Sequence, residues 1–463
     1  MIKQEKYPKW LFIVFPAIAM LLGWGLRGYI GGGPFGAMIP GAMVAMTISI
    51  LLELPPGIAS IFVLFGVVGV GIGGEMTYGQ TLGFLKNSDT IWWGTLGTTV
   101  KGSIWGLLGG IILSMGLLYN RLSKKTIIIG FLVLLIGMLI GFKLINQPMV
   151  IYFSDPAKPR AESWAALLFG AIALLLFLKN KMDFVDFSII SRFALCGLIG
   201  GGLGFGLGGF WMVLGLQLPT DVIFQEYWKA MEFTFGLLLG SAFGYAAWLC
   251  RNELDSEKAI PTAKDNYAVN PILKELAVTF IIGLLIFWFF SFLFDPIVEA
   301  GKGIRGFTMV GFRDLAILLS NYTFFGLIMI VTVMRFPKVA WQLAITLTFC
   351  HTLIDLFSDI YPDAAANSPF TALFALVFII TFIVASLTAF YQRSKYKLHN
   401  LFLILVWSTV LVAFLRFAIN TKIPNISELS ISELLFRIFF VHIVFMMSAL
   451  FVSWISYKNK TVT

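Results

Sequence analysis

The sequence predicts an all-α protein that crosses a membrane many times. Of its 463 residues, 59% are hydrophobic and only 12% are charged, and the mean hydropathy is +0.90. Soluble domains carry about 25% charged residues, so this composition excludes an ordinary soluble domain. The apolar runs are also longer than the strands of a membrane β-barrel, and we therefore expect them to be helices.

About fourteen apolar runs have the length that a membrane helix needs, roughly 17 residues or more. They lie at 10–30, 35–54, 57–80, 91–118, 126–146, 163–179, 188–214, 222–249, 273–294, 314–334, 338–359, 369–391, 399–419 and 432–456. The first run has no small-residue cleavage site after it, so we expect a retained span rather than a signal peptide.

The charges between the runs predict how the helices are oriented. Basic clusters such as RLSKK, LKNKMD, MRFPK and YQRSKYK follow even-numbered runs, whereas the opposite loops are mixed or acidic. The positive-inside rule then places both termini in the cytoplasm, in a plasma membrane such as the bacterial inner membrane. The net charge of +9 follows from this topology and does not indicate nucleic-acid binding.

The longest cytoplasmic loop divides the predicted helices into two groups. Residues 251–272 are polar and include Pro261 and Pro271, which is typical of a linker. The expected organisation is an eight-helix membrane part at 1–250, this linker loop, and a six-helix membrane part at 273–463.

Four copies of the pattern GxGxxG occur in the chain: GWGLRG (23–28), GVGIGG (69–74), GFGLGG (204–209) and GKGIRG (301–306). A dinucleotide-binding turn needs a preceding strand, and these segments lie among apolar helices, so we do not expect a nucleotide site. Two interpretations remain open: close packing of helix backbones, or broken helices whose free backbone groups line a site. The stretch RGYIGGGPFGAMIPGAM (27–43) predicts an unwound turn before a helix that begins near Pro34, where an anion would be attracted.

Two segments of the first part align with each other. FGVVGVGIGG (65–74) matches GGGLGFGLGG (200–209), and KGSIWGLLGG (101–110) then matches MEFTFGLLLG (231–240). This predicts a parallel internal repeat of helices three–four and seven–eight, as in many transporters. The alternative is that glycine-rich membrane helices resemble each other by composition alone.

Ionisable residues inside the spans are candidates for function because they are costly there. Lys101 and Glu232 lie near the middle of their helices and at adjacent positions of the alignment, so we expect a charge pair, unless each finds its own partner. The candidates for substrate binding in the outer half are Arg27, Glu75, Thr77, Tyr78, Gln80, Arg305, Arg313 and Asp314. Arg27 would present a planar fork to an anion; the rival view is that it snorkels to lipid headgroups.

A third group is formed by His351, Asp355 and Asp359, which share one helix face because they are four residues apart. They could hold a metal or relay protons, but the spacing is not a specific metal signature, and no metal or cofactor is predicted. Cys196, Cys250 and Cys350 lie within apolar runs and do not form a disulfide framework.

These features favour a transporter that binds a small anionic or polar solute in an outer-facing cavity, with coupling to protons or ions left open. The alternative is an integral-membrane acyl or glycosyl transferase acting on a lipid-linked or periplasmic substrate, with His351, Asp355 and His442 in acid–base roles. An enzyme is less favoured because the loops are small. The expected partners are the solute and membrane lipids, and the sequence fixes neither the substrate nor the oligomeric state.

Overall fold

The computed structural model describes residues 7–29, 33–76, 78–154, 162–217, 227–255, 272–288, 322–350, 372–420, 430–431 and 440–459, and contains no strand among them. Within these ranges, nine helices are long and apolar enough to cross a membrane, and three shorter apolar helices accompany them. The predicted class, an all-α protein of the membrane with many spans, is confirmed.

The long helices of the first part begin and end within a few residues of the predicted runs. They are α1 (Lys9–Arg27), α2 (Gly33–Leu51), α3 (Pro56–Gly73), α5 (Ile91–Leu117), α6 (Lys124–Gly141), α7 (Trp164–Lys179), α8 (Phe184–Gln217) and α9 (Tyr227–Asp255). A short helix, α4 (Gly79–Phe84), precedes α5, and a π-helical turn at Phe142–Asn146 extends α6. Pro40 lies inside α2 without ending it.

The second part is described in pieces. Its helices are α10 (Ile272–Trp288), α13 (Tyr322–Arg335), the 3-10 turn η4 (Pro337–Val339), the π-helix η5 (Gln342–Leu347), α16 (Ala372–Tyr391), α17 (Lys397–Asn420) and α19 (Phe440–Lys458). The two parts pack against each other, since α17 and α19 contact α1 and α13 contacts α3. Residues 256–271 of the predicted linker lie outside the described residues.

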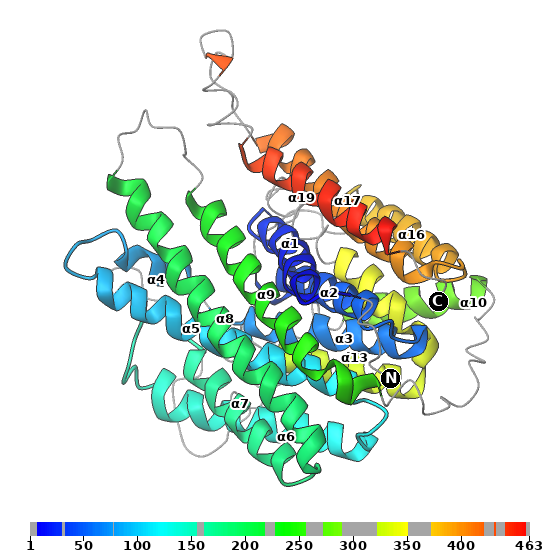
Figure 1. Cartoon of the computed structure of the whole chain (residues 1–463), viewed down its shortest axis with the longest axis horizontal. Helices are drawn as coiled ribbons and strands as arrows, with labels where there is room; N and C mark the ends of the chain where they lie inside the picture. The colour runs from blue at the N-terminus through cyan, green and yellow to red at the C-terminus, as the bar shows by residue number, and fades with distance from the viewer. Residues whose placement is uncertain are drawn as a thin grey trace.

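Neighbouring helices run antiparallel, as their glycine contacts show. Along α5 and α8, Gly102 meets Gly201, Gly106 meets Gly197 and Gly110 meets Phe193, so one number rises as the other falls. The same opposition relates α3 to α5, α8 to α9 and α9 to α1. Helix ends therefore gather at two ends of the bundle: the Arg27 end, where α1 finishes, and the terminal end, where α1 begins and α19 finishes (Figure 1).

The glycine motifs of α3 and α8 are close-packing surfaces: the first forms the last turn of α3, and the second lies within the continuous helix α8. A Cβ on Gly73 would lie 2.1 Å from Trp105, and one on Gly204 would lie 3.0 Å from Phe235. Small residues let the backbones of membrane helices approach in this way. For these two motifs the packing interpretation is confirmed and the broken-helix interpretation is wrong, while 301–306 lies outside the described residues.

The first motif behaves differently because a turn follows it. Helix α1 continues through GWGL and ends at Arg27, and α2 begins at Gly33, whose φ of +60° is a left-handed conformation that suits glycine. The predicted start of a new helix near Pro34 is confirmed, while residues 30–32 of the predicted unwound turn lie outside the described residues.

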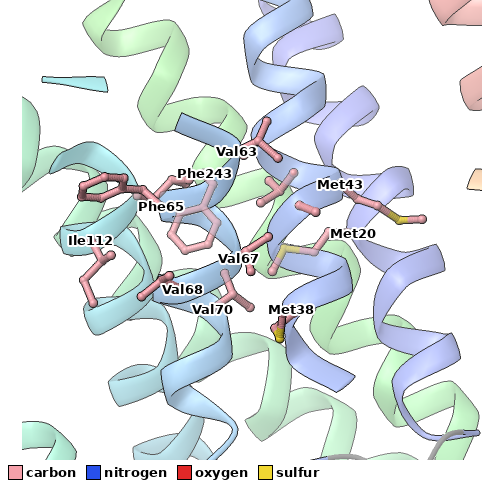
Figure 2. Packing of buried hydrophobic residues seen from close by; sticks show 14 of the residues in the cluster. Met20, Met38, Met43, Val63, Phe65, Val67, Val68, Val70, Ile112 and Phe243 are labelled. Atoms are coloured by element: carbon pink, nitrogen blue, oxygen red, sulfur yellow. The ribbon is translucent and has the colours of Figure 1, made fainter. Parts of the chain in front are cut away.

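Helix α3 lies at the centre of the core. Its residues Val63, Phe65 and Val67 pack among side chains of α1, α2, α5 and α9, including Met20 and Phe243 (Figure 2). By contrast, α8 turns one face outward, where every fourth residue is between 50% and 58% exposed: Leu195, Ile199, Leu203 and Leu207. An apolar stripe of this kind fits contact with lipid, so α8 lies at the rim of the bundle.

Candidate functional site

The guanidinium of Arg27 is buried at the Arg27 end of the bundle. Its side chain is only 2% exposed, and its Cζ lies 5.0–5.5 Å from the ring centroids of Trp24, Tyr78 and Trp105. Nη1 donates a hydrogen bond to the Tyr78 hydroxyl. Among the described residues no carboxylate pairs with Arg27, and its Nε has no hydrogen-bond partner. The predicted alternative of an arginine that snorkels to lipid headgroups is therefore wrong.

The rings around Arg27 are fixed by three helices. Trp24 lies one turn before Arg27 on α1 and meets the Trp105 ring of α5 edge-on, with centroids 4.9 Å apart. Trp105 occupies the space that Gly73 leaves open, and its Nε1 donates to the carbonyl of Val70 at 2.8 Å. These contacts hold the rings in place. Their orientation matters because a cation is attracted to the face of an aromatic ring.

Tyr78 connects this cage to α9. It lies just before α4, and its ring stacks on Trp228 with centroids 6.0 Å apart. Burial raises the pKa of the Tyr78 phenol to about 12; Arg27 acts to lower it and Glu232 to raise it. The phenol is therefore neutral at pH 7. Because both Arg27 and Glu232 act on its pKa, both charges lie close to the Tyr78 hydroxyl.

A buried ion pair occupies the first turns of α9. Glu232 is fully buried and accepts hydrogen bonds from Lys229 Nζ at 2.7 Å and from Trp228 Nε1 at 2.9 Å. Lys229 also donates to the carbonyl of Gly25 at 3.1 Å, which ties α9 to the end of α1. A Cβ on Gly28 would lie 2.1 Å from both Glu232 oxygens, so the carboxylate lies directly against the end of α1.

Lys101 has a different partner. Its Nζ donates to Glu162 Oε1 and to Thr81 Oγ1, both at 2.7 Å. Glu162 also accepts from the Phe153 amide and the Ser154 hydroxyl, each at 2.9 Å. The predicted pair of Lys101 with Glu232 is wrong: Lys101 pairs with Glu162, and Glu232 pairs with Lys229. Both true partners lie outside the aligned segments, so the alignment could not find them.

Glu75 and His442 lie near this region but make other contacts. Glu75 Oε1 accepts from the backbone N–H of Thr323 at 2.9 Å, so it caps the beginning of α13. His442 of α19 is buried between the rings of Tyr29 and Phe414, with centroids 6.2 and 5.0 Å away. The Tyr29 ring centroid lies 3.9 Å from Lys229 Nζ, so Tyr29 separates His442 from the ion pair of Lys229 and Glu232.

The remaining predicted residues are not placed. Thr77, Arg305, Arg313, Asp314, His351, Asp355 and Asp359 lie outside the described residues, and the side chain of Gln80 is not described. The sequence reasoning missed Lys229, Glu162 and the aromatic cage. Lys229 could have been found, since it lies three residues before Glu232 and is therefore on the same helix face.

The site as described is a buried cationic cluster. Arg27 and Lys229 contribute +2 and Glu232 contributes −1, so the cluster carries a net charge of +1, whereas the pair of Lys101 and Glu162 is neutral. Comparison of the chain with family models, with curated proteins and with solved structures finds no match. The chemistry of the site is accordingly argued from its own residues.

Proposed function

We propose that this protein is a membrane transporter that binds a small anionic or polar solute at Arg27. The observation that supports the proposal is the buried guanidinium without a carboxylate partner among the described residues. A buried charge without a counter-ion is costly in a membrane protein, and such residues mark substrate or ion pathways. A negatively charged group of a solute would compensate the charge.

The proposed topology is fourteen spans with both termini cytoplasmic and the Arg27 end outside, in a plasma membrane. The antiparallel order of α1, α2, α3, α5, α6, α7, α8 and α9 supports it, because each consecutive long helix reverses direction. Basic residues such as Arg121, Arg192 and Arg393 lie at the terminal end, on the side where the positive-inside rule expects them.

Transport also requires that the site open to water. Arg27 is 2% exposed, so the described conformation is closed around it, and the proposed cycle includes a second conformation in which the outer cavity opens. We keep the parallel repeat within this proposal: the antiparallel pairs α3–α5 and α8–α9 pack through the contact of α5 with α8, which would let one pair move against the other.

The test compares two arginine-to-lysine variants of the full chain in lipid nanodiscs and proteoliposomes. Arg27→Lys keeps the charge but loses the planar fork, and we expect solute binding and uptake to fall about tenfold or more. Arg192→Lys is the matched control, since Arg192 pairs with Glu253 at the terminal end. Uptake and binding by Arg27→Lys equal to those of the unmodified protein would contradict the proposal.

The transferase alternative depends on His351, Asp355 and His442. The first two lie outside the described residues, and His442 packs between rings. No described contact favours it over transport, and it stays a prediction.

A further inference from the structure

We infer that the anion bound at Arg27 is a monocarboxylate, held on the Nε–Nη2 edge of the guanidinium. The inference rests on the proposed function and names the class of solute. Three observations carry it: the hydrogen bonds that Arg27 leaves unmade, a second buried donor beside it, and the net charge of the cluster.

The first observation concerns the two edges of the guanidinium. Tyr78 accepts from Nη1, and among the described residues nothing accepts from Nε or Nη2. The Nε–Nη2 edge presents two parallel N–H groups, and their spacing matches the two oxygens of a carboxylate. Tyr78 thus binds Nη1 at the end of the guanidinium and leaves the Nε–Nη2 edge for a ligand.

The second observation is that Trp24 Nε1 is also buried without a hydrogen-bond partner. Its ring centroid lies 5.5 Å from Arg27 Cζ, so both donors without partners belong to one cluster. Buried polar groups are nearly always hydrogen-bonded, so two unmet donors on neighbouring side chains point to a missing acceptor. A carboxylate has lone pairs for all three N–H groups, and the rings of Trp24, Tyr78 and Trp105 suit an apolar body attached to it.

The third observation is the charge count. The cluster of Arg27, Lys229 and Glu232 carries +1, so one monoanion neutralises it. A dianion such as succinate or hydrogen phosphate would leave one negative charge that these three residues do not compensate, which is costly. The fixed carboxylate of Glu232 therefore acts as a selectivity element for singly charged solutes.

The experiment uses benzoate, its neutral analogue benzamide, succinate and inorganic phosphate as probes. Binding to the full chain in nanodiscs is measured by calorimetry and by thermal shift at pH 7.4. We expect saturable binding of benzoate, and binding of benzamide, succinate and phosphate at least about tenfold weaker. Arg27→Lys should lose the benzoate signal, because lysine offers no bidentate edge.

A second set of variants tests the charge count independently. Glu232→Gln raises the cluster charge from +1 to +2, and the preference should shift about tenfold or more toward succinate and phosphate. Lys229→Met combined with Glu232→Gln restores +1 and should restore the preference for benzoate. This double variant is therefore the control at unchanged charge. Lys229→Met alone lowers the cluster charge from +1 to 0 and should weaken benzoate binding about tenfold or more, so it tests the charge count if Glu232→Gln does not fold.

The outcomes distinguish a failure of the monocarboxylate assignment from a failure of the proposed function. Specific binding of phosphate or succinate, with benzoate bound no better, would overturn the monocarboxylate assignment and leave the anion transporter intact. A preference in folded Glu232→Gln equal to that of the unmodified protein, or benzoate binding left unchanged by Lys229→Met, would overturn the role of the cluster charge. Equal binding of every probe by the unmodified protein and by Arg27→Lys would contradict the proposed function itself.

Discussion

Arg27 and Lys101 are both buried cations, but the groups that surround them differ. Lys101 is only 1% exposed, but it faces Glu162 and Thr81, and Glu162 is itself held by two further donors. Every strong charge in that group has a partner. Arg27 has aromatic rings and one hydroxyl instead, and this difference supports the proposal that a solute binds at Arg27 and not at Lys101.

The structural character of the Lys101 pair gives a prediction for stability. Lys101→Met and Glu162→Gln should each cost about 3–5 kcal/mol, because each strands the opposite buried charge. The double variant should cost clearly less than the sum. The free energy of unfolding in mixed detergent micelles measures all three.

A second double variant, Lys101→Met with Glu232→Gln, tests whether Glu232 is a partner of Lys101. Because Glu232 pairs with Lys229, these two changes should be additive within about 0.5 kcal/mol. A coupling between Lys101 and Glu232 larger than that between Lys101 and Glu162 would refute the described pairing.

At this scale the sequence singled out Arg27 and Tyr78 as candidates, but it did not show what they contact. An intramembrane charge is visible in a sequence because it interrupts an apolar run. Its partner is not visible, since Glu162 reaches Lys101 from a segment 61 positions away. The cage has the same limitation, because Trp24 and Trp105 are ordinary apolar positions until α1 and α5 are packed together.

At the scale of helices, glycine determines how closely α5 and α8 approach. A Cβ on Gly106 would lie 1.8 Å from the carbonyl oxygen of Gly197, and the reverse contact is 2.1 Å. The sequence predicted both helices well, because the length of an apolar run suffices for that. It could not decide between packing and breakage, since the same glycines permit both and the choice depends on the neighbouring helix.

A matched pair of glycine variants in α5 tests this packing. Gly106→Ala should lower stability by about 1–3 kcal/mol, because α5 and α8 must separate to admit the methyl group. Gly109→Ala is the control: its Cβ would make an ordinary contact of 3.4 Å with Phe243. Since alanine favours a helix over glycine by about 1 kcal/mol, the control should be neutral or slightly stabilised. Equal thermal shifts for the two variants would contradict the close contact.

At the scale of the whole molecule, the two ends of the bundle differ in chemistry. The terminal end carries ion pairs between helix ends, such as Arg121 with Asp186 at 2.6 Å. The Arg27 end carries the buried cluster and a surface turn at 86–89 whose residues are exposed. The alternation of loop charges predicted that basic residues gather at one end of the bundle, because such a prediction needs only the order of the helices along the chain. It could not show that the two predicted parts pack together as α1 with α19, which depends on long-range contacts.

The orientation of the two ends gives the last prediction. Ser88 is exposed in the turn before α5 at the Arg27 end, and Lys181 is exposed in the turn between α7 and α8 at the terminal end. In a variant with Cys196, Cys250 and Cys350 replaced by alanine, Ser88→Cys should react with an impermeant maleimide in intact cells. Lys181→Cys should react only after the membrane is permeabilised, because the basic loops remain in the cytoplasm. The opposite pattern would place Arg27 on the cytoplasmic side and reverse the proposed direction of solute access. Labelling of both positions in intact cells would contradict the antiparallel order, since α5, α6 and α7 together must carry the chain across the membrane three times between these two positions.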